Sequence, residues 1–234
     1  MKSEPGGPQH SSHALTVVDG VPVVVDAPST DSFSRTVQTI LKRCIDLFVA
    51  GVGILLLSPL WIPLALTVGL TSRGPVLYRQ RRLKQSGQVF TMYKFRTMVD
   101  GAETMLDQVF HLNKANGPLF KTPDDPRVTP VGRFLRTRFL DELPQLINVL
   151  KGDMSLVGPR PCLESELALH PTVLAFRFSV PQGLTGPWQT NGHHGITFDD
   201  QLRVERVYVE SWTLGSDLRI LGRTIPLVLR STGF

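Results

Sequence analysis

The stretch that decides the fold is residues 45–70, IDLFVAGVGILLLSPLWIPLALTVGL, an apolar run whose one charge, Asp46, stands at its edge. At about 1.5 Å per residue, a helix of this length can cross a bilayer. Pro59 and Pro63 interrupt the middle of the run, and each removes a backbone donor and kinks a helix. The sequence therefore predicts a membrane segment that does not cross as one straight helix.

Basic residues flank this segment on both sides. They are Lys42, Arg43, Arg73, Arg79, Arg81, Arg82 and Lys84. Because Lys and Arg near a membrane segment favour the cytoplasmic side, both ends are expected on one face. We expect a re-entrant membrane helix hairpin over residues 35–72, broken at Ser58 and Pro59, where the serine hydroxyl is a candidate partner for freed backbone groups. A proline-kinked span and a long buried core helix remain open as alternatives.

The composition narrows the class of ligand. The chain has 234 residues and a formal net charge of +5, which favours one compact domain with tails. A basic protein with an apolar anchor favours anionic lipid or phosphate ligands. No aromatic-interleaved basic motif is present, so we expect no nucleic acid partner. Cys44 and Cys162 stand far apart without metal-ligand spacing, which fits a reducing compartment.

Three parts of the chain are distinguished by their patterns. Residues 1–34 are polar and predict a disordered tail. Residues 73–234 predict a cytosolic domain of α+β, mainly helical fold, with residues 183–234 as a C-terminal extension. Within the domain, strands are expected at 76–78 and 88–93, and helices at 100–112, 131–139, 143–150, 199–214 and 215–230. The last helix has an apolar stripe beside a row of arginines, which predicts an amphipathic helix in the membrane interface or one packed on the core.

Asp141 and Glu142 are adjacent acids at the predicted start of the helix at 143–150. Acids are favoured at helix N-termini, so helix-end electrostatics alone is one interpretation. Their surroundings favour another. Arg136 precedes them, and Arg160 follows in a rigid Gly-Pro-Arg-Pro turn at 158–161. Guanidinium groups bind phosphate bidentately. Acids, arginines and an anchor together indicate phosphate chemistry at a membrane surface.

Several longer motifs follow one another in a fixed order. They are Lys-Arg-x-x-Asp at 42–46, Ser-Pro at 58–59, Arg-Gly-Pro at 73–75, Tyr-Lys-Phe-Arg-Thr-Met at 93–98, Leu-Asp-Glu-Leu-Pro-Gln at 140–145, Gly-Asp-Met-Ser-Leu-Val-Gly-Pro-Arg-Pro at 152–161 and Gly-Leu-Thr-Gly at 183–186. In this order the chain resembles the bacterial monotopic phosphoglycosyl transferases, the polyprenyl-phosphate sugar-1-phosphate transferase family, from Lys42 to its C-terminus.

This resemblance implies an enzyme that transfers a sugar 1-phosphate from a nucleotide sugar to a polyprenyl phosphate. It implies that Asp141 is a nucleophile forming a phosphosugar-aspartyl intermediate, and that Glu142 binds Mg²⁺. It also implies phosphate binding by Arg136 and Arg160, the latter between Pro159 and Pro161. Such a mechanism splits one transfer into two steps, and arginines with Mg²⁺ neutralise the phosphate charge.

Other implications concern the strand before these acids and the anchor. Lys94 and Arg96 are candidate additional phosphate contacts, with a solvated basic strand as the alternative. The family's anchor is a re-entrant helix broken at the Ser-Pro that matches Ser58 and Pro59. The resemblance thus implies a monotopic protein on the cytosolic face of the bacterial inner membrane, in contact with membrane lipid, and it is compatible with a homodimer.

The segment from residue 183 onward resembles the hexose-1-phosphate transferases that initiate exopolysaccharide or O-antigen units. That resemblance implies UDP-glucose or UDP-galactose as donor and undecaprenyl phosphate as acceptor. One departure is Asn191-Gly192-His193, where the subgroup usually has Ser-Gly-Arg; His193 and His194 are candidate metal or phosphate contacts or solvent-facing loop residues. An amino-sugar transferase, an inactive membrane-bound assembly protein and a Mg²⁺-dependent phosphatase remain alternatives.

Overall fold

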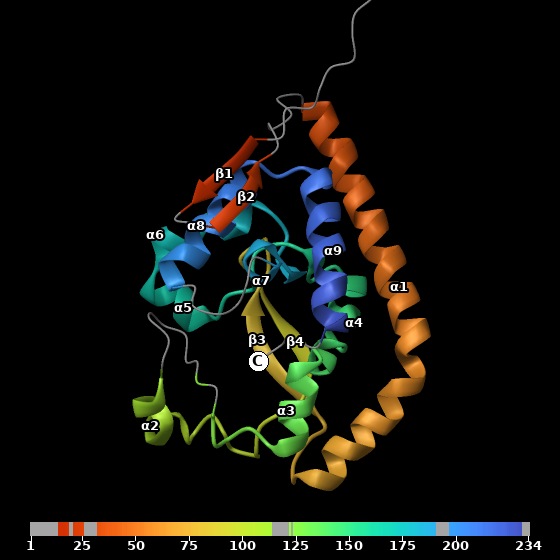
Figure 1. Cartoon of the computed structure of the whole chain (residues 1–234), viewed down its shortest axis with the longest axis vertical. Coiled ribbons are helices and arrows are strands. Elements are labelled where there is room, and N and C mark those ends of the chain that lie inside the picture. Colours follow the sequence, from red (N-terminus) through yellow and green to blue (C-terminus); the bar gives the residue numbers. More distant parts are fainter. Residues whose placement is uncertain are drawn as a thin grey trace, which may run out of the picture.

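A computed structural model describes residues 14–18, 21–25, 32–113, 122, 124–190 and 197–230. Its longest element is α1 (Ser32–Thr71), which bows around one side of the domain (Figure 1). In the described part of the chain, α1 is the one helix long and apolar enough to cross a membrane. Many of its large apolar side chains are exposed, among them Phe48, Leu55, Leu56 and Leu70. This exposure is compatible with a membrane anchor.

Both prolines lie inside α1 without ending it. Pro59 has no amide hydrogen to give to the carbonyl of Leu55, four residues earlier, so that carbonyl would lack a partner. Ser58 Oγ donates to it at 2.8 Å, and a side chain thereby repairs the gap left by the proline. The structure therefore has one continuous, curved helix where the sequence predicted a broken hairpin.

The N-terminal half of α1 docks onto the domain through its charged side chains. Lys42 Nζ donates to the last carbonyl of β5 (Ser155–Val157) at 2.8 Å, and Asp46 Oδ1 accepts from the central amide of β5 at 3.0 Å. Arg43 donates to two carbonyls at the end of α4 (Gln145–Lys151), at 2.7 and 3.0 Å. The Lys-Arg-x-x-Asp motif therefore binds α1 to the domain.

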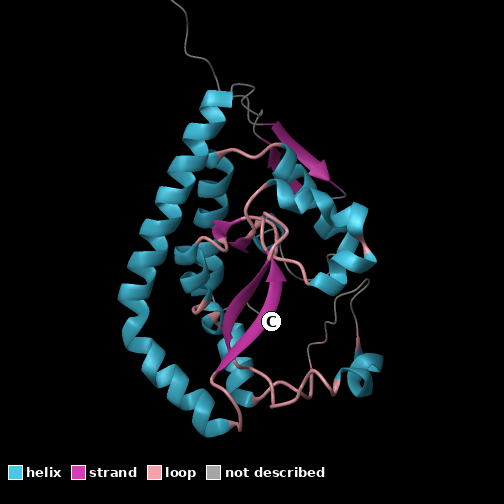
Figure 2. Cartoon of the chain, turned by 180° about the vertical axis from the view of Figure 1, so that it is seen from behind, coloured by secondary structure: helices cyan, strands magenta, loops and turns pink. Residues whose placement is uncertain are grey.

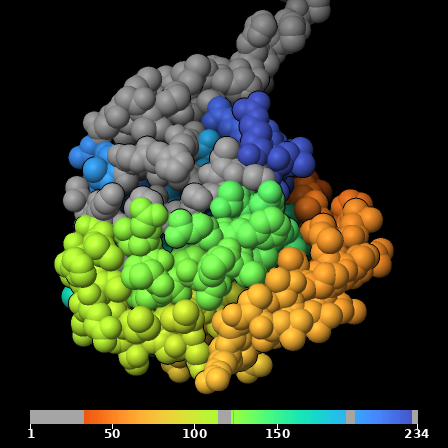
Figure 3. All heavy atoms as spheres, turned by 60° about the horizontal axis from the view of Figure 1, so that its bottom comes forward, coloured from red at the N-terminus to blue at the C-terminus, as the bar shows by residue number. Residues whose placement is uncertain are grey.

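The C-terminal half of α1 contacts the opposite end of the same domain. Val68 packs with Phe95 and Leu135 in a small apolar cluster. Arg96 donates to the backbone carbonyl and the hydroxyl of Ser72 at 2.6 and 2.8 Å, just beyond the end of α1. Figure 3 shows this half of the helix, in orange, beside the green segment that includes α3. Both ends of α1 thus contact one domain.

The domain consists of short helices around small two-stranded sheets (Figure 2). The elements besides α1, α4 and β5 are β1 (Ala14–Val18), β2 (Val21–Val25), β3 (Leu77–Leu83), β4 (Val89–Phe95), α2 (Leu106–Val109), η1 (Phe110–Leu112), α3 (Pro130–Thr137), η2 (Leu140–Glu142), α5 (Glu164–Leu169), α6 (Pro171–Leu174), η3 (Ala175–Ser179), β6 (Gly183–Thr185), α7 (Pro187–Thr190), α8 (Phe198–Glu210) and α9 (Leu214–Leu229). β1–β2 and β3–β4 pair antiparallel, and β5–β6 pair parallel.

The main core lies where α4, β4, β5, α8 and α9 meet. Its buried members include Val149, Leu156, Tyr208, Val209 and Ile220. The apolar face predicted for the helix at 143–150 contributes Leu146 to this core. Burial of such a face supplies most of the stability of a short helix. The core therefore fixes α4, and with it the acidic residues just before it.

The predicted mainly helical fold is confirmed, with three differences in detail. β3 runs to Leu83, beyond the strand predicted at 76–78, because β3 and β4 pair along their full length. The helix predicted at 100–112 is reduced to α2 and η1. The tail predicted as disordered contains β1 and β2, which contact α8. The interfacial placement of α9 stays a prediction.

Candidate active site

The adjacent acids lie in a tight turn between α3 and α4. Phe139 follows α3 with φ 56°, the one non-glycine residue with positive φ among the described residues. This left-handed conformation turns the chain into η2, which carries Asp141 and Glu142. Non-glycine residues adopt it at an energetic cost that often marks a functional site. The acids therefore precede α4, with Pro144 as the residue before its first turn.

The Asp141 carboxylate is buried, with 8% of the residue exposed. In the described part of the chain it accepts no hydrogen bond from another residue's side chain. Burial raises its pKa to about 6, the charge of Glu142 adds to the rise, and Lys94 and Arg136 oppose it. A poorly solvated carboxylate is a stronger nucleophile than a hydrated one. Asp141 can therefore attack an electrophile when it is ionised, above about pH 6.

Glu142 has a different environment. Lys94 Nζ donates to its Oε1 at 2.7 Å, and 31% of the Glu142 side chain is exposed. Burial acts to raise its pKa, but the charge of Lys94, that hydrogen bond and the charge of Arg160 hold the pKa below the ordinary value. The two adjacent acids thus have pKa values moved in opposite directions, a pattern found where two carboxyls have different roles.

Arg136 approaches these acids from α3. Its Nε donates to Thr97 Oγ1 at 2.9 Å. Burial lowers the pKa of the guanidinium, and the charge of Asp141 is the largest effect that opposes this decrease. Since α3 contacts η2, the charge of Arg136 favours the ionised form of Asp141. This position agrees with the phosphate-binding role that the sequence predicts.

The Gly-Pro-Arg-Pro turn presents Arg160 from the other side. Pro159 and Pro161 are buried, and their carbonyls accept from Gly183 N at 2.9 Å and Arg82 Nη1 at 2.8 Å. The Arg160 guanidinium makes no hydrogen bond in the described part of the chain, and its charge lowers the pKa of Glu142. The two prolines hold the turn, and the arginine is left to bind a ligand.

Arg96 is not brought to these acids. Its residue is 7% exposed, and its guanidinium donates to Ser72 at the end of α1. The predicted phosphate contact at Arg96 stays a prediction, and its observed bonds favour a structural role.

The region 191–196, which holds His193 and His194, lies outside the described residues. Sequence reasoning assigned no site role to Thr97, although it lies in the motif at 93–98, and it placed Arg82 only in the basic flank of the anchor.

The donor set fits Mg²⁺. Among the described residues there is no cluster of three or more His, Cys, Asp and Glu side chains. Mg²⁺ commonly uses one or two protein carboxylates together with phosphates and water, so a larger cluster is not required. Glu142 offers a partly exposed, ionised carboxylate. Its charge also disfavours ionisation of Asp141, and a divalent cation would relieve that repulsion.

Comparison with known proteins identifies the family of this chain. A family described as bacterial sugar transferase matches residues 37–231. The exopolysaccharide production protein ExoY of Rhizobium meliloti is 38% identical over 88% of this chain and 93% of its own length. The undecaprenyl-phosphate galactose phosphotransferase of Salmonella typhimurium is 38% identical over 87% of this chain and 43% of its own length. The UDP-glucose:undecaprenyl-phosphate glucose-1-phosphate transferase of Klebsiella pneumoniae is 35% identical over 89% of this chain and 43% of its own length. The chain therefore belongs to the bacterial sugar transferase family.

Proposed function

We propose that this protein transfers a sugar 1-phosphate from a UDP-sugar to undecaprenyl phosphate, through a covalent intermediate on Asp141. The observation that carries the proposal is the buried Asp141 carboxylate, which accepts no hydrogen bond from another residue's side chain in the described part of the chain and is acted on by the charges of Lys94 and Arg136. A nucleophile among cations suits attack on a phosphorus that carries negative oxygens. The names of the two phosphotransferases support the same reaction.

Two displacements complete the transfer. A carboxylate oxygen of Asp141 forms a bond to the sugar-bearing phosphorus, and the bond from that phosphorus to the bridging oxygen breaks. UMP leaves with the bridging oxygen and its electron pair. A phosphate oxygen of the acceptor then bonds to the same phosphorus and displaces the carboxylate. Arg136 and Arg160 hold the phosphate oxygens during both steps.

Glu142 is the residue that would hold Mg²⁺, together with phosphate oxygens of the donor. A bound Mg²⁺ would neutralise the diphosphate. In the structure, Lys94 Nζ donates to Oε1 of the same Glu142 carboxylate at 2.7 Å. This ion pair keeps Glu142 ionised and holds it beside Asp141. We expect chelator to abolish turnover, and Glu142→Gln to need more Mg²⁺ for half-maximal turnover. Unchanged metal dependence in that variant would contradict the assignment.

The anchor is proposed to be re-entrant, on the cytosolic face of the inner membrane. Both ends of α1 contact one domain, through Arg43 at one end and Val68 at the other, which supports entry and exit by one face. In a variant with Cys44 replaced by Ser, Ser32→Cys should be protected from an impermeant thiol reagent outside intact cells. A cysteine replacing an exposed residue of the domain, Ser86, is the matched control. If the reagent labelled the cysteine at residue 32 and not the one at residue 86, α1 would cross the membrane completely.

The proposed donor is UDP-glucose or UDP-galactose. The support is the pair of relatives named for galactose and glucose, although this chain spans under half the length of each. A site that hydrogen-bonds a hydroxyl discriminates strongly against analogues without that group. UMP release should therefore be faster from UDP-glucose or UDP-galactose than from UDP-GlcNAc or UDP-GalNAc. A preference for an N-acetyl donor would support the amino-sugar alternative.

One experiment tests the reaction itself. The purified full chain is incubated with Mg²⁺ and each UDP-sugar, with and without undecaprenyl phosphate. We expect UMP release to require the lipid for multiple turnovers, and intact-mass analysis without lipid to show a sugar-phosphate adduct. Sustained sugar-phosphate release without lipid would indicate the phosphatase alternative. Absence of UMP release with every donor would indicate an inactive assembly protein.

A further inference from the structure

Thr97 lies where the end of the β3–β4 hairpin meets α3. Its Oγ1 accepts the Nε–H of Arg136 at 2.9 Å, and the residue is 7% exposed. The two residues are 39 positions apart in sequence, so the contact depends on the tertiary fold. A hydrogen bond from a cation in a buried site is stronger than one between neutral groups. The bond therefore restrains the Arg136 side chain.

The backbone at this junction is held just as closely. Thr97 O accepts from Thr129 N at 3.0 Å, and Thr129 Oγ1 accepts from Gly132 N at 2.9 Å, which caps α3. A Cβ at Gly132 would collide with the backbone carbonyl of Thr97. Gly132 and Arg136 are one turn apart on the same face of α3. The close approach at Gly132 thus brings Arg136 to the Thr97 hydroxyl.

The direction of this bond matters for the guanidinium. Nε is occupied by Thr97, and in the described part of the chain the two terminal nitrogens of Arg136 make no hydrogen bond. These nitrogens form the planar fork that binds two phosphate oxygens at once. The charge of Asp141 acts on the same guanidinium. Holding Nε therefore fixes the plane of the fork beside the nucleophile.

We propose that Thr97 is a positioning residue, whose hydroxyl orients the Arg136 guanidinium so that its terminal nitrogens bind two oxygens of the donor diphosphate. This inference rests on the proposed function, because it assigns a partner to the phosphate-binding arginine. It predicts that Thr97 acts only through Arg136. A threonine with a purely structural role would lower stability and leave diphosphate binding unchanged.

The test is a double-mutant cycle in which the measured quantity is the affinity for pyrophosphate. Calorimetry measures the affinity of the purified full chain for inorganic pyrophosphate, which is not turned over. Thr97→Val should weaken binding about tenfold, as expected for loss of one restraint on a charged hydrogen bond. Thr97→Ser, which keeps Oγ, should bind within about twofold of the unmodified protein. In an Arg136→Gln background, Thr97→Val should cause no further loss.

A matched control separates positioning from folding. Thr224→Val removes a threonine hydroxyl outside this site, which is partly buried and bonded to Thr185 Oγ1 at 2.9 Å. It should lower the melting temperature as Thr97→Val does and leave pyrophosphate affinity unchanged. Additive losses with Arg136→Gln, or failure of Thr97→Ser to restore binding, would overturn the inference. Absence of UMP release from every donor would overturn only the proposed function, since pyrophosphate binding is measured without turnover.

Discussion

Asp141 and Asp217 are both buried, with 8% and 3% of each residue exposed, and burial raises the pKa of both carboxyls. Their partners differ. Asp217 accepts from Lys42 Nζ at 2.5 Å, Tyr208 OH at 2.6 Å and Trp212 Nε1 at 3.2 Å. Asp141 accepts no side-chain hydrogen bond in the described part of the chain. Burial alone therefore does not distinguish a structural acid from a reactive one, and the partners do.

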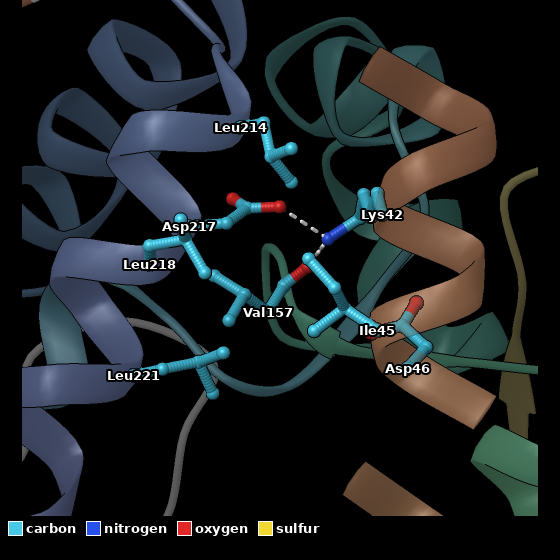
Figure 4. Close-up of a pocket in the computed structure, with 8 residues that line it drawn as sticks. All are labelled: Lys42, Ile45, Asp46, Val157, Leu214, Asp217, Leu218 and Leu221. Atoms are coloured by element: carbon cyan, nitrogen blue, oxygen red, sulfur yellow. Dashed lines mark hydrogen bonds and ion pairs between the residues drawn. The ribbon is translucent and has the colours of Figure 1, made fainter. Parts of the chain in front are cut away.

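The partners also explain what each aspartate does. Figure 4 shows Lys42 reaching from α1 toward Asp217 on α9, and the same Nζ also donates to the backbone carbonyl of Val157. This carboxylate accepts from three donors, on α1, on α8 and in the loop before α9, and it joins the anchor helix to the domain. Asp141 has cations nearby without bonds from them, so its oxygens are left for a substrate.

Asp141→Asn should give the largest change in activity and no loss of folding. Without the nucleophile, UMP release should fall by at least about 10⁴-fold.

The stability of this variant should depend on pH. The pKa of the Asp141 carboxyl in the folded protein, about 6, lies above its ordinary value of 3.8. The carboxyl therefore stabilises the fold below pH 3.8, and this contribution is lost as the pH rises through 6. At pH 8 the variant should melt no lower than the unmodified protein. Appreciable UMP release would contradict the assignment.

Asp217→Asn should show the opposite pattern. Removing the charge leaves Lys42 buried beside an uncharged group, which should cost about 3 kcal/mol of unfolding free energy. Thermal unfolding of the purified protein measures the loss. Replacing both members, with Lys42→Met and Asp217→Leu, should recover part of it, because no unpaired charge remains. Full stability of Asp217→Asn would mean that the ion pair does not hold α1.

Much of this arrangement follows from the sequence, and the exceptions have physical causes. A glycine after an apolar helical stripe is typical of a helix end, and Gly152 ends α4 with φ 82°, a conformation in which a glycine has no steric penalty. Lys94 lies in β4, but β4 ends at Phe95. Because Arg96 lies beyond the strand, the alternation of side chains does not fix the direction of its side chain. The Arg96 guanidinium turns instead to the end of α1.

The basic residues before the anchor show a different limit of prediction from sequence. From the sequence, Lys42 and Arg43 indicate the cytoplasmic side of the membrane, and in the structure both bind groups of the domain over a hundred residues away in sequence. Lys42 is 4% exposed and paired with Asp217. No local pattern contains that information, because the partners meet only in the folded chain. The same applies to Thr97, whose role depends on the approach of α3.

Arg160→Lys should give an intermediate effect on activity. Lysine keeps the charge but loses the planar fork, so kcat/KM for the donor should fall about 10- to 100-fold. The turn itself should remain, since Pro161 and Arg82 hold it through the backbone. Near-normal melting with reduced UMP release is therefore the expected result. Equal activity of the lysine variant would show that charge alone is needed at this position.

The smallest predicted effect is a shift in pH dependence. Only ionised Asp141 attacks, so kcat/KM should fall as the pH drops through about 6, the pKa of the free protein. Lys94 lowers the pKa of both acids. Lys94→Met should therefore move this fall in activity to higher pH. Lys84→Met, which removes a lysine 3.8 Å from Asp153, is the matched control and should leave the profile in place. A shift to lower pH in Lys94→Met would mean that another group limits the reaction, because loss of a neighbouring cation can only make the Asp141 carboxyl harder to ionise.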